Sequence, residues 1–503
     1  MRIGLLYPEW TGAYGIMGYF ARRNSTWPPL NLALIGAILE KCGHDVFIID
    51  GQYEGLSPEK LAAKAVAKNP RLIGFTATSP FFGHQRLVAE EIKRIAPNII
   101  TVVGGPHVSI VKQEALLNCF DYGFVGEVEK TLQQFLQELE GGRDVSHIKG
   151  LLFKRDGQVI FTGDPQWEED LDSLPFPARH LLPMGGYRLG TLQGRLSFTS
   201  IQMTRGCPWK CIFCASENLN TTLVRRRSAE KVVAEIEHVV DTWGIRHFYF
   251  VDDVLTLHEE HILEVCDLIE QQKLRITFEG STRANLINEA SVKRMAECGL
   301  IRLSFGLETV DTEMRKTMKK KVPLQHYVTA NKLLNDYNVE ALNSVMIGLP
   351  GETRETIKKT LDFLANTREV KQANLAIAVP YPGTELHHMA ATGEHGIKLL
   401  SDDFSKYRRY GTAVTEVNGL TPKDLVELQN EGFVRIYSAP WRWRPMFGKH
   451  GVIGALLMLL RVGRLVVQKA VRRAFGDWQP PRLATNAGSL PAGHLGSPKS
   501  PNF

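Results

Sequence analysis

Alternation between apolar segments of strand length and amphipathic segments of helix length is the feature that most constrains the fold of this 503-residue chain. The first 140 residues contain five segments of each kind. The expected strands span residues 2–7, 45–50, 72–78, 99–104 and 122–125, and the expected helices span residues 30–41, 58–68, 85–95, 111–118 and 129–140. Such alternation predicts a parallel sheet with helices on both faces. Ligands of open sheets of this kind bind beyond the carboxyl ends of the strands.

The pattern changes between residues 146 and 196. Two short apolar segments flank Asp156-Gly157, a dipeptide typical of hairpin turns. Pro175 and Pro177 follow, and their rings prevent a regular helix there. We therefore expect a first domain over residues 1–145 and a hairpin with a linker over residues 146–196.

The alternation resumes in residues 197–400, which we expect to form a second domain. Its expected strands span residues 198–203, 247–251, 277–279, 300–305, 341–347 and 373–379, and its expected helices span residues 228–243, 258–271, 288–299, 324–335 and 354–366. These units predict a partial, six-stranded (β/α)6 relative of the eight-stranded TIM barrel. Active-site residues of such barrels lie at the carboxyl ends of the strands.

Basic residues are concentrated near the carboxyl terminus. Residues 432–476 contain nine Lys or Arg and no Asp or Glu, so the rest of the chain has a net charge of −3 although the whole chain has +6. Basic character confined to one segment does not indicate a nucleic-acid-binding protein. We expect a helical, basic region over residues 401–478 and a disordered tail over residues 479–503, which are rich in Pro, Gly, Ser and Ala.

The apolar run at residues 451–460 is too short to span a bilayer. The Trp, Leu and Arg residues around it are typical of a helix that lies in the membrane interface. A helix that packs on the barrel and keeps its Arg side chains in solvent is an equal alternative.

Three of the seven cysteines, Cys207, Cys211 and Cys214, follow the first strand of the second domain. Their CxxxCxxC spacing supplies three thiolates, and cysteine sulfur is the usual ligand of iron in iron–sulfur clusters. A [4Fe–4S] cluster on three cysteines leaves one iron without a protein ligand, so that iron can bind a substrate. The alternative is a structural zinc site, but the loop holds neither a second CxxC pair nor a His.

Residues 203–214 resemble the cluster-binding loop of the radical SAM superfamily, whose members cleave S-adenosylmethionine (SAM) with a [4Fe–4S] cluster. The resemblance implies that Cys207, Cys211 and Cys214 hold the cluster and are catalytic, and that Phe213 lies beside the adenine of SAM. Other positions match family elements in the same order, and the resemblance implies that they contact SAM: Ser216, Glu217, Asp252, Arg283, Glu308, Gly348 and Gly351. The glycines that are usual in the family beside Ser216-Glu217 are absent here.

The first domain resembles the Rossmann-like cobalamin (B12)-binding domain that precedes the barrel in one radical SAM subfamily, and the resemblance covers roughly residues 1–400. It implies a cobalamin site at the strand ends, formed by Thr76, Ser79, Gly104, Gly105, His107, Gly126 and Glu127. Thr76 and Ser79 are expected to donate hydrogen bonds to the buried base of the nucleotide tail. The glycines allow the cofactor to approach the backbone.

Many cobalamin domains carry a DxHxxG motif after the first strand, but residues 8–12 contain no His. We therefore expect no His below the cobalt, and we expect His107 to be a loop residue near the corrin. The alternative is a domain of the same fold without a cofactor.

Together these resemblances imply an enzyme that uses a [4Fe–4S] cluster, SAM and cobalamin. The expected reaction is methylation of an unactivated carbon of a small-molecule substrate through a 5′-deoxyadenosyl radical and methylcobalamin. If the carboxyl-terminal helix lies in the membrane interface, we expect a hydrophobic substrate. One alternative is oxidative cyclisation or oxygenation, as in the anaerobic magnesium-protoporphyrin ester cyclases, which share this domain order. A second is a non-catalytic cobalamin or cluster sensor.

We expect flavodoxin or ferredoxin as the electron donor and no nucleic-acid partner. The first residues lack a basic segment and a cleavage site, which predicts a cytoplasmic protein. The carboxyl-terminal helix would add a peripheral contact with the inner face of the membrane.

Overall fold

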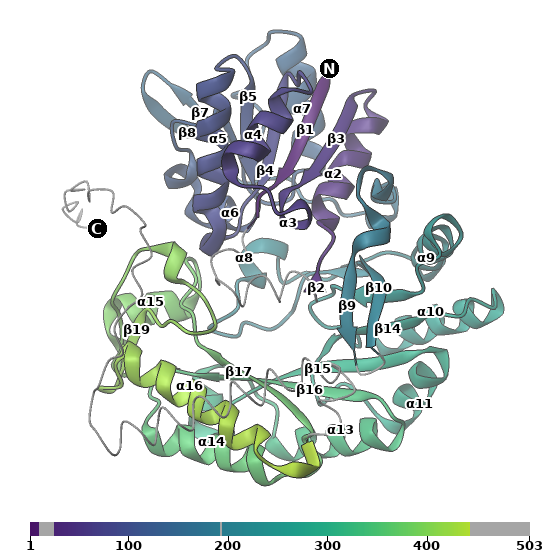
Figure 1. Cartoon of the computed structure of the whole chain (residues 1–503), viewed down its shortest axis with the longest axis vertical. Coiled ribbons are helices and arrows are strands. Elements are labelled where there is room, and N and C mark those ends of the chain that lie inside the picture. The colour runs from purple at the N-terminus through teal and green to yellow at the C-terminus, as the bar shows by residue number, and fades with distance from the viewer. Residues whose placement is uncertain (10–24, 192–193, 443–503) are drawn as a thin grey trace.

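The chain folds into two stacked α/β domains, as a computed structural model shows for residues 1–9, 25–191 and 194–442 (Figure 1). The first sheet has the strand order β3-β1-β4-β5-β6-β7-β8. Its strands are β1 (Arg2–Tyr7), β3 (Asp45–Asp50), β4 (Leu72–Thr76), β5 (Ile100–Gly104), β6 (Tyr122–Phe124), β7 (Leu151–Arg155) and β8 (Gln158–Phe161). The first five are parallel, which confirms the expected sheet.

Helices cover both faces of this sheet. They are α2 (Leu30–Lys41), α3 (Gly51–Glu54), α4 (Pro58–Val66), α5 (Phe82–Ile95), α6 (Pro106–Val111) and α7 (Glu129–Glu140). Leu39 of α2 and Phe135 of α7 pack on one face, while Leu61 of α4 and Ile92 of α5 pack on the other. The buried apolar residues of α2, α4, α5 and α7 therefore lie on the sides of these helices that face the sheet.

One expected helix of this domain is wrong. Residues 111–118 do not form a helix; α6 ends at Val111 and a 3-10 turn over Lys112–Ala115 follows. Pro106 occupies the first turn of α6, where its missing N–H costs nothing. Lys112 has a φ of 51°, a left-handed conformation that cannot continue a right-handed helix.

The hairpin forms around Asp156 and Gly157, which have φ values of 51° and 77°. Two positive φ angles in a two-residue loop match the twist of the flanking strands. Strand β7 pairs antiparallel with β6, and β8 pairs antiparallel with β7. The first sheet therefore continues beyond residue 145, and the hairpin belongs to it rather than to the linker.

The second sheet has the order β17-β16-β15-β14-β13-β10-β9-β2. Its parallel strands, six as expected, are β10 (Gly194–Ile201), β13 (His247–Phe250), β14 (Thr277–Thr282), β15 (Leu300–Glu308), β16 (Glu340–Ile347) and β17 (Gln372–Ile377). Strand β9 (Arg188–Thr191) pairs antiparallel with β10, and β2 (Ser25–Thr26) pairs with β9. We call this second sheet and its outer helices the half-barrel. Strand β2 therefore joins the amino-terminal segment to the edge of the half-barrel.

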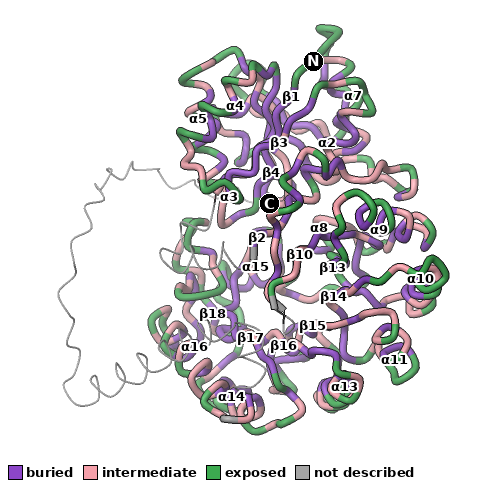
Figure 2. The backbone as a smooth tube through the Cα atoms, turned by 45° about the vertical axis from the view of Figure 1, so that its right-hand side comes forward, coloured by how far each residue is buried: buried purple, intermediate pink, exposed green. Residues whose placement is uncertain are grey.

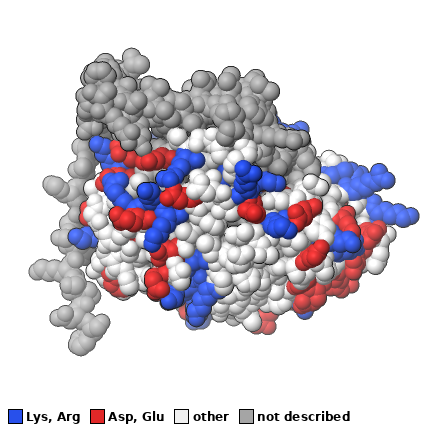
Figure 3. Space-filling model, turned by 90° about the horizontal axis from the view of Figure 1, so that it is seen from below, with Lys and Arg blue, Asp and Glu red and all other residues white. Residues whose placement is uncertain are grey.

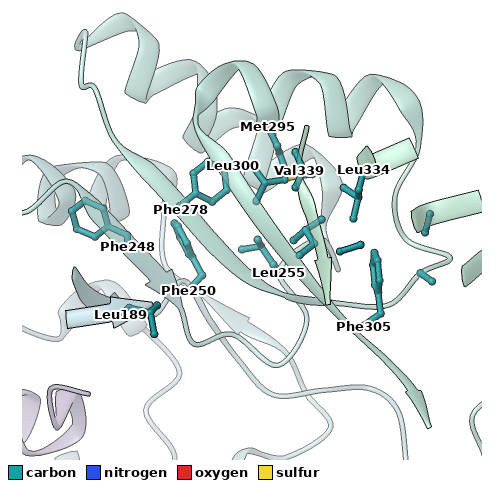
Figure 4. Packing of buried hydrophobic residues seen from close by; sticks show 14 of the residues in the cluster. Leu189, Phe248, Phe250, Leu255, Phe278, Met295, Leu300, Phe305, Leu334 and Val339 are labelled. Atoms are coloured by element: carbon teal, nitrogen blue, oxygen red, sulfur yellow. The ribbon is translucent and has the colours of Figure 1, made fainter. Parts of the chain in front are cut away.

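The helices of the half-barrel lie outside its curved sheet (Figures 1 and 2). They include α9 (Ala229–Trp243), α10 (Glu259–Gln271), α11 (Glu289–Cys298), α12 (Thr312–Thr317), α13 (Leu324–Asp336) and α14 (Arg354–Asn366). Figure 4 shows Phe278, Leu300 and Phe305 packed with Met295 of α11 and Leu334 of α13. Residues Ser304 and Gly306 alternate with these buried side chains along β15 and face the lumen.

The carboxyl-terminal region closes the free edge of the half-barrel. It contains α15 (Glu385–Thr392), β18 (Ile397–Leu399), β19 (Thr415–Val417), α16 (Pro422–Tyr437) and the 3-10 turn Pro440–Arg442. Helix α16 packs on α14 and β17. Gln429 of α16 donates hydrogen bonds to the carbonyls of Leu375 and Arg409, both at 2.9 Å.

Residues 443–503 lie outside the described residues, and so do the expected interfacial helix and the expected tail. None of the helices in the described ranges has the length and apolar character needed to cross a membrane. On the face seen in Figure 3, acidic and basic side chains are interspersed.

Candidate active site

The cysteines lie in a loop, residues 206–224, at the carboxyl end of β10. Its base is closed by a two-residue ladder between β11 (Thr204–Arg205) and β12 (Arg225–Arg226). Gly206 begins the loop with a φ of 104°, and a Cβ atom there would overlap the carbonyl oxygen of Leu223. Glycine is therefore required where the loop leaves the sheet.

Contacts from the barrel mouth hold the loop in place. The carbonyl of Ile212 accepts a hydrogen bond of 2.8 Å from the N–H of Leu386, and the Ile212 side chain is buried beside Met314 and Leu349. Trp209 lies under the guanidinium of Arg283, 4.2 Å from its ring centroid. These contacts fix the loop over the ends of β14 and β16.

All three cysteines of the loop are free thiols; Cys207 is buried, Cys211 is half-buried and Cys214 is exposed. Burial raises the pKa of Cys207 to about 11, so this thiol is protonated at neutral pH and has to lose its proton when it binds a metal. Among the described residues, no three His, Cys, Asp or Glu side chains converge as ligands of a single ion would. Cysteines that hold a [4Fe–4S] cluster each bind a different iron and need no such convergence.

The two aspartates after β13 both support the loop. Asp252 is buried and accepts hydrogen bonds from the N–H of Met203 and from the hydroxyl and N–H of Thr204. Burial raises its pKa to about 6. Asp253 accepts a hydrogen bond of 2.5 Å from Ser216, at the start of α8 (Ser216–Asn220). Both carboxylates thus shape the loop from beneath.

The predicted Ser216-Glu217 pair points in two directions. The hydroxyl of Ser216 is held by Asp253, whereas Glu217 is exposed and forms a surface ion pair of 2.5 Å with Lys210. The structure therefore does not bring Glu217 together with the other predicted residues.

Glu308 and Lys320 form an ion pair of 2.7 Å at the mouth of the barrel. A register shift between Gly306 and Glu308 turns the end of β15, and Glu308 has a φ of 63°. Such bulges redirect a side chain at the end of a strand. A Cβ atom on Gly306 would overlap both charged groups. Lys320 also lies 5.7 Å from the ring centroid of Phe213, which places this pair beside the cysteine loop.

The glycine-rich turn after β16 is fixed by a buried carboxyl group. Glu352 accepts hydrogen bonds of 2.5 Å from the N–H of Gly348 and 3.0 Å from that of Leu349. Burial raises the pKa of Glu352 to about 8. Gly348 packs against Leu425, whereas a Cβ atom on Gly351 would meet nothing within 4 Å. Gly351 therefore presents open backbone.

A cavity of about 560 Å³ joins the two domains. Its inner part is an apolar slot between the first sheet and helices α2 and α7, lined by Leu5, Leu39, Val102 and Leu136. Its other part lies at the strand ends and reaches Gln202, Leu219 and Asn220 of the barrel. The cavity therefore connects the first domain with the base of the cysteine loop and with α8.

Most residues predicted for cobalamin line this cavity. They are Thr76, Gly104, Gly105, Gly126 and Glu127. Thr76 accepts a hydrogen bond of 2.9 Å from Asn31. Gly105 has a φ of 95°, and a Cβ atom there would lie 2.7 Å from the hydroxyl of Thr76 and 2.8 Å from the N–H of Ala77.

Ser79 and His107 do not line the cavity. They bond to each other at 3.0 Å, and the ring of His107 packs against Phe82 and Phe404, with centroids at 4.3 and 5.1 Å. Burial lowers the pKa of His107 to about 4, so its ring is neutral at neutral pH. His107 thus forms part of the contact between the first domain and the carboxyl-terminal region.

Sequence reasoning missed two largely buried cations, one at the barrel mouth and one at the base of the cysteine loop. Lys320 belongs to a run of three lysines that resembles a solvated surface, yet its side chain is only 11% exposed. Arg225 belongs to a run of three arginines but is buried beside Glu127. No local pattern distinguishes these cations from solvated ones, because their partners lie outside the runs, 12 residues from Lys320 and 98 residues from Arg225.

The chain matches known families in both domains. Residues 201–364 match the Radical SAM superfamily, and residues 17–136 match the B12 binding domain. The chain is 31% identical over 443 residues to an uncharacterised methyltransferase of Pyrococcus horikoshii. The aligned region covers 87% of this chain and 94% of the relative. It is 26% identical over 447 residues to an anaerobic magnesium-protoporphyrin IX monomethyl ester cyclase of Rubrivivax gelatinosus, with coverage of 87% and 77%.

The fold is similar to that of the radical SAM methyltransferase TsrM from Kitasatospora setae. The TM-score is 0.67 at 17% sequence identity, and the similarity covers 94% of this chain and 99% of TsrM. Given both domain matches and the relative that aligns over almost its whole length, the chain belongs to the radical SAM superfamily, among the enzymes that carry an amino-terminal B12-binding domain.

Proposed function

We propose that this protein is a cobalamin-dependent radical SAM methyltransferase that acts on an unactivated carbon of a small molecule. The observation that carries the proposal is the cavity that runs from the apolar slot of the first domain to the base of the cysteine loop. When bound, the iron–sulfur cluster supplies the electron that cleaves SAM, and cobalamin supplies the methyl group. The residues of the chain have to hold both groups on either side of one substrate and keep water out.

The residues present fit cobalamin. The apolar slot suits the flat base of the nucleotide tail, and Gly74 and Gly105 line the cavity without adding a side chain to it. Glu129 lines the cavity, and its Oε2 atom is buried without a hydrogen-bond partner. A corrin ring carries amide groups on its rim, which can donate to such an oxygen. The first domain therefore offers shape complementarity in the slot and a free acceptor at its mouth.

The barrel mouth fits a cluster with SAM. Cys207, Cys211 and Cys214 are the donor set for three irons. Glu308 and Lys320 place opposite charges beside Phe213, where the amino, carboxylate and hydroxyl groups of SAM need polar partners. Gly351 presents open backbone to the adenine. The Nε atom of Arg283 is buried without a partner and remains available to a polar group in the lumen.

The relative from Rubrivivax supports a second candidate, oxidative cyclisation or oxygenation by the same cofactors. The two reactions differ in their product, because methylation adds one carbon to the substrate and cyclisation removes hydrogen. Label transfer from methyl-labelled SAM into a product therefore distinguishes them. Under either reaction, we propose flavodoxin or ferredoxin as the electron donor and a peripheral membrane contact through residues 452–475, with a hydrophobic substrate if that contact exists.

The test is the cofactor content of protein purified without oxygen from cells supplied with cobalamin. We expect about four irons and one cobalt per chain, and we expect the Cys207/Cys211/Cys214→Ala triple variant to lose the iron and keep the cobalt. Iron without cobalt in the wild type would overturn methyl transfer from cobalamin and leave the radical SAM assignment. Loss of both metals in the variant would contradict separate sites.

A further inference from the structure

Two carboxylates of the first domain and two guanidiniums of the barrel form an ion network across the domain boundary. Arg225 donates two hydrogen bonds to Glu127, at 2.6 and 2.8 Å. Arg205 lies 3.3 Å from Glu127 and donates a hydrogen bond of 2.8 Å to Glu129. We call these four residues the domain clamp. A bidentate pair of this kind fixes orientation as well as distance, because both planar groups must align.

All four side chains of the domain clamp are buried. None is more than 9% exposed. Burial disfavours the ionised form of Glu127, but the two guanidiniums outweigh it and keep its pKa below the usual value. Arg225 is further held by Trp167, 5.5 Å from its ring centroid, and by the carbonyl of Glu168 at 2.6 Å. Glu127 is therefore ionised at neutral pH, and burial shields its contacts with both guanidiniums from solvent and salt.

The residues of the domain clamp connect the base of the cysteine loop with the apolar slot of the first domain. Arg205 and Arg225 belong to β11 and β12, the ladder that closes the base of the cysteine loop, and Arg205 precedes Cys207 by two residues. Glu127 follows β6, and Glu129 is the first residue of α7, whose later turns line the apolar slot. Glu127, Glu129 and Arg205 also line the cavity.

We propose that the domain clamp positions the cysteine loop against the cobalamin-binding domain and so sets the separation between the two cofactors. The consequence for the cofactors rests on the proposed function, whereas the mechanical coupling between the domains does not. In this role Glu127, Glu129, Arg205 and Arg225 are positioning residues, which act through the loop and through α7. A charged pair suits this task because it has one favourable geometry, unlike an apolar contact, which can slide.

Hydrogen exchange tests the mechanical part without cofactors. Glu127→Gln should accelerate amide exchange in residues 203–207 and 225–227 roughly tenfold, because the base of the loop loses its anchor. The matched control is Glu340→Gln. Glu340 is also buried and forms an ion pair of 3.1 Å with Arg302, but this pair lies at the amino ends of the barrel strands. Unchanged exchange in residues 203–207 of Glu127→Gln would overturn the proposal.

A double variant separates positioning from folding. Glu127→Gln alone leaves Arg225 buried without its bidentate partner, whereas Glu127→Gln/Arg225→Gln leaves no charge of that pair unmatched. The double variant should therefore regain most of the melting temperature that the single variant loses, and it should still exchange rapidly at the base of the loop. Recovery of slow exchange together with stability would show that the clamp only stabilises the fold, which contradicts a positioning role.

Electron paramagnetic resonance tests the consequence for the cofactors. In wild type and Glu340→Gln, the reduced cluster should accelerate the spin relaxation of cob(II)alamin to the same degree, since this effect depends steeply on the distance between the two spins. In the double variant loaded with both cofactors, the acceleration should change. The same acceleration of spin relaxation in the double variant as in the wild type would overturn this part of the proposal. If the wild-type protein binds no cobalt, the proposed function is refuted instead. The mechanical role of the domain clamp would then be tested by hydrogen exchange alone.

Discussion

Lys320 and Glu308 bring opposite charges to 2.7 Å from each other beside Phe213, at the mouth of the half-barrel. The pair depends on Gly306, where any side chain would overlap both groups. It also depends on the bulge that gives Glu308 a φ of 63°. Strained backbone beneath a charged pair is typical of a ligand site rather than of a surface ion pair.

We expect Lys320→Met and Glu308→Gln each to weaken SAM binding by about 10- to 100-fold, since hydrogen bonds to charged groups contribute roughly 1.5–3 kcal/mol. Equilibrium dialysis of the cluster-loaded protein measures this dissociation constant. Iron content should stay at the wild-type level, because neither residue is a cluster ligand. Unchanged affinity in both variants would exclude the pair from the SAM site.

The start of the cysteine loop tolerates no side chain, so Gly206→Ala should reduce the iron bound per chain at least severalfold. Its methyl group would overlap the carbonyl of Leu223, and its φ of 104° costs a non-glycine residue about 1–3 kcal/mol. The matched control is Gly244→Ala, which has a φ of 66° and open space around it. Iron analysis after reconstitution measures the effect, and equal iron in both variants would contradict it.

Gly105→Ala should lower the cobalt content while the iron content stays unchanged. The new methyl group would lie 2.7 Å from the Thr76 hydroxyl and 2.9 Å from the carbonyl of Ala77, so the strand ends at the cavity must move apart. Gly142→Ala is the control, because Gly142 has a φ of 64° but faces nothing within 4 Å. Cobalt retained by both variants would argue against a cofactor at this strand end.

The buried His107 should make the first domain less stable in acid. Its pKa is about 4 in the folded protein and near 6.5 when unfolded, so between these values the unfolded chain binds more protons and stability falls as the pH falls. At pH 5 the loss is about 2 kcal/mol, which corresponds to a decrease in melting temperature of about 6 °C.

His107→Gln lacks the titrating group and should melt at nearly the same temperature at pH 7 and pH 5, after subtraction of the changes common to both proteins. Glu352 titrates in the opposite sense, because its pKa is raised to about 8, but it is present in both proteins and cancels. An equal pH dependence of the two melting temperatures would show that His107 does not control it.

The basic segment beyond Arg442 should contribute the membrane contact. Arg442 is buried and donates hydrogen bonds to the carbonyls of Lys371 and Leu364, so a truncation after Arg442 keeps these contacts. The truncated protein should lose co-sedimentation with vesicles that contain anionic lipid, and the full chain should lose it in high salt. Equal binding of both proteins would exclude a membrane role for this segment.

Local sequence determined much of the fold. The period of the apolar residues placed α2, α7 and α14 at their observed limits and identified all six parallel strands of the half-barrel, because burial on one face leaves a repeat that a sequence displays directly. The CxxxCxxC spacing likewise identified the loop, since three nearby thiols have few other uses. The helix expected at residues 111–118 was misplaced because the observed helix α6 begins earlier, at Pro106, and ends at Val111, where the positive φ of Lys112 stops it.

Only the tertiary structure decided which polar residues work together. Glu127 and Arg225 are separated by 98 residues, and their pairing depends on how two domains stack. His107 resembled a residue of the cofactor site, yet it packs against Phe404, which comes from the other end of the chain. In the sequence Lys320 resembles a solvated lysine, but in the structure the bulge in β15 places Glu308 beside it. Electrostatic partners are chosen by proximity in space, and a sequence records that proximity only where the partners lie on the same element.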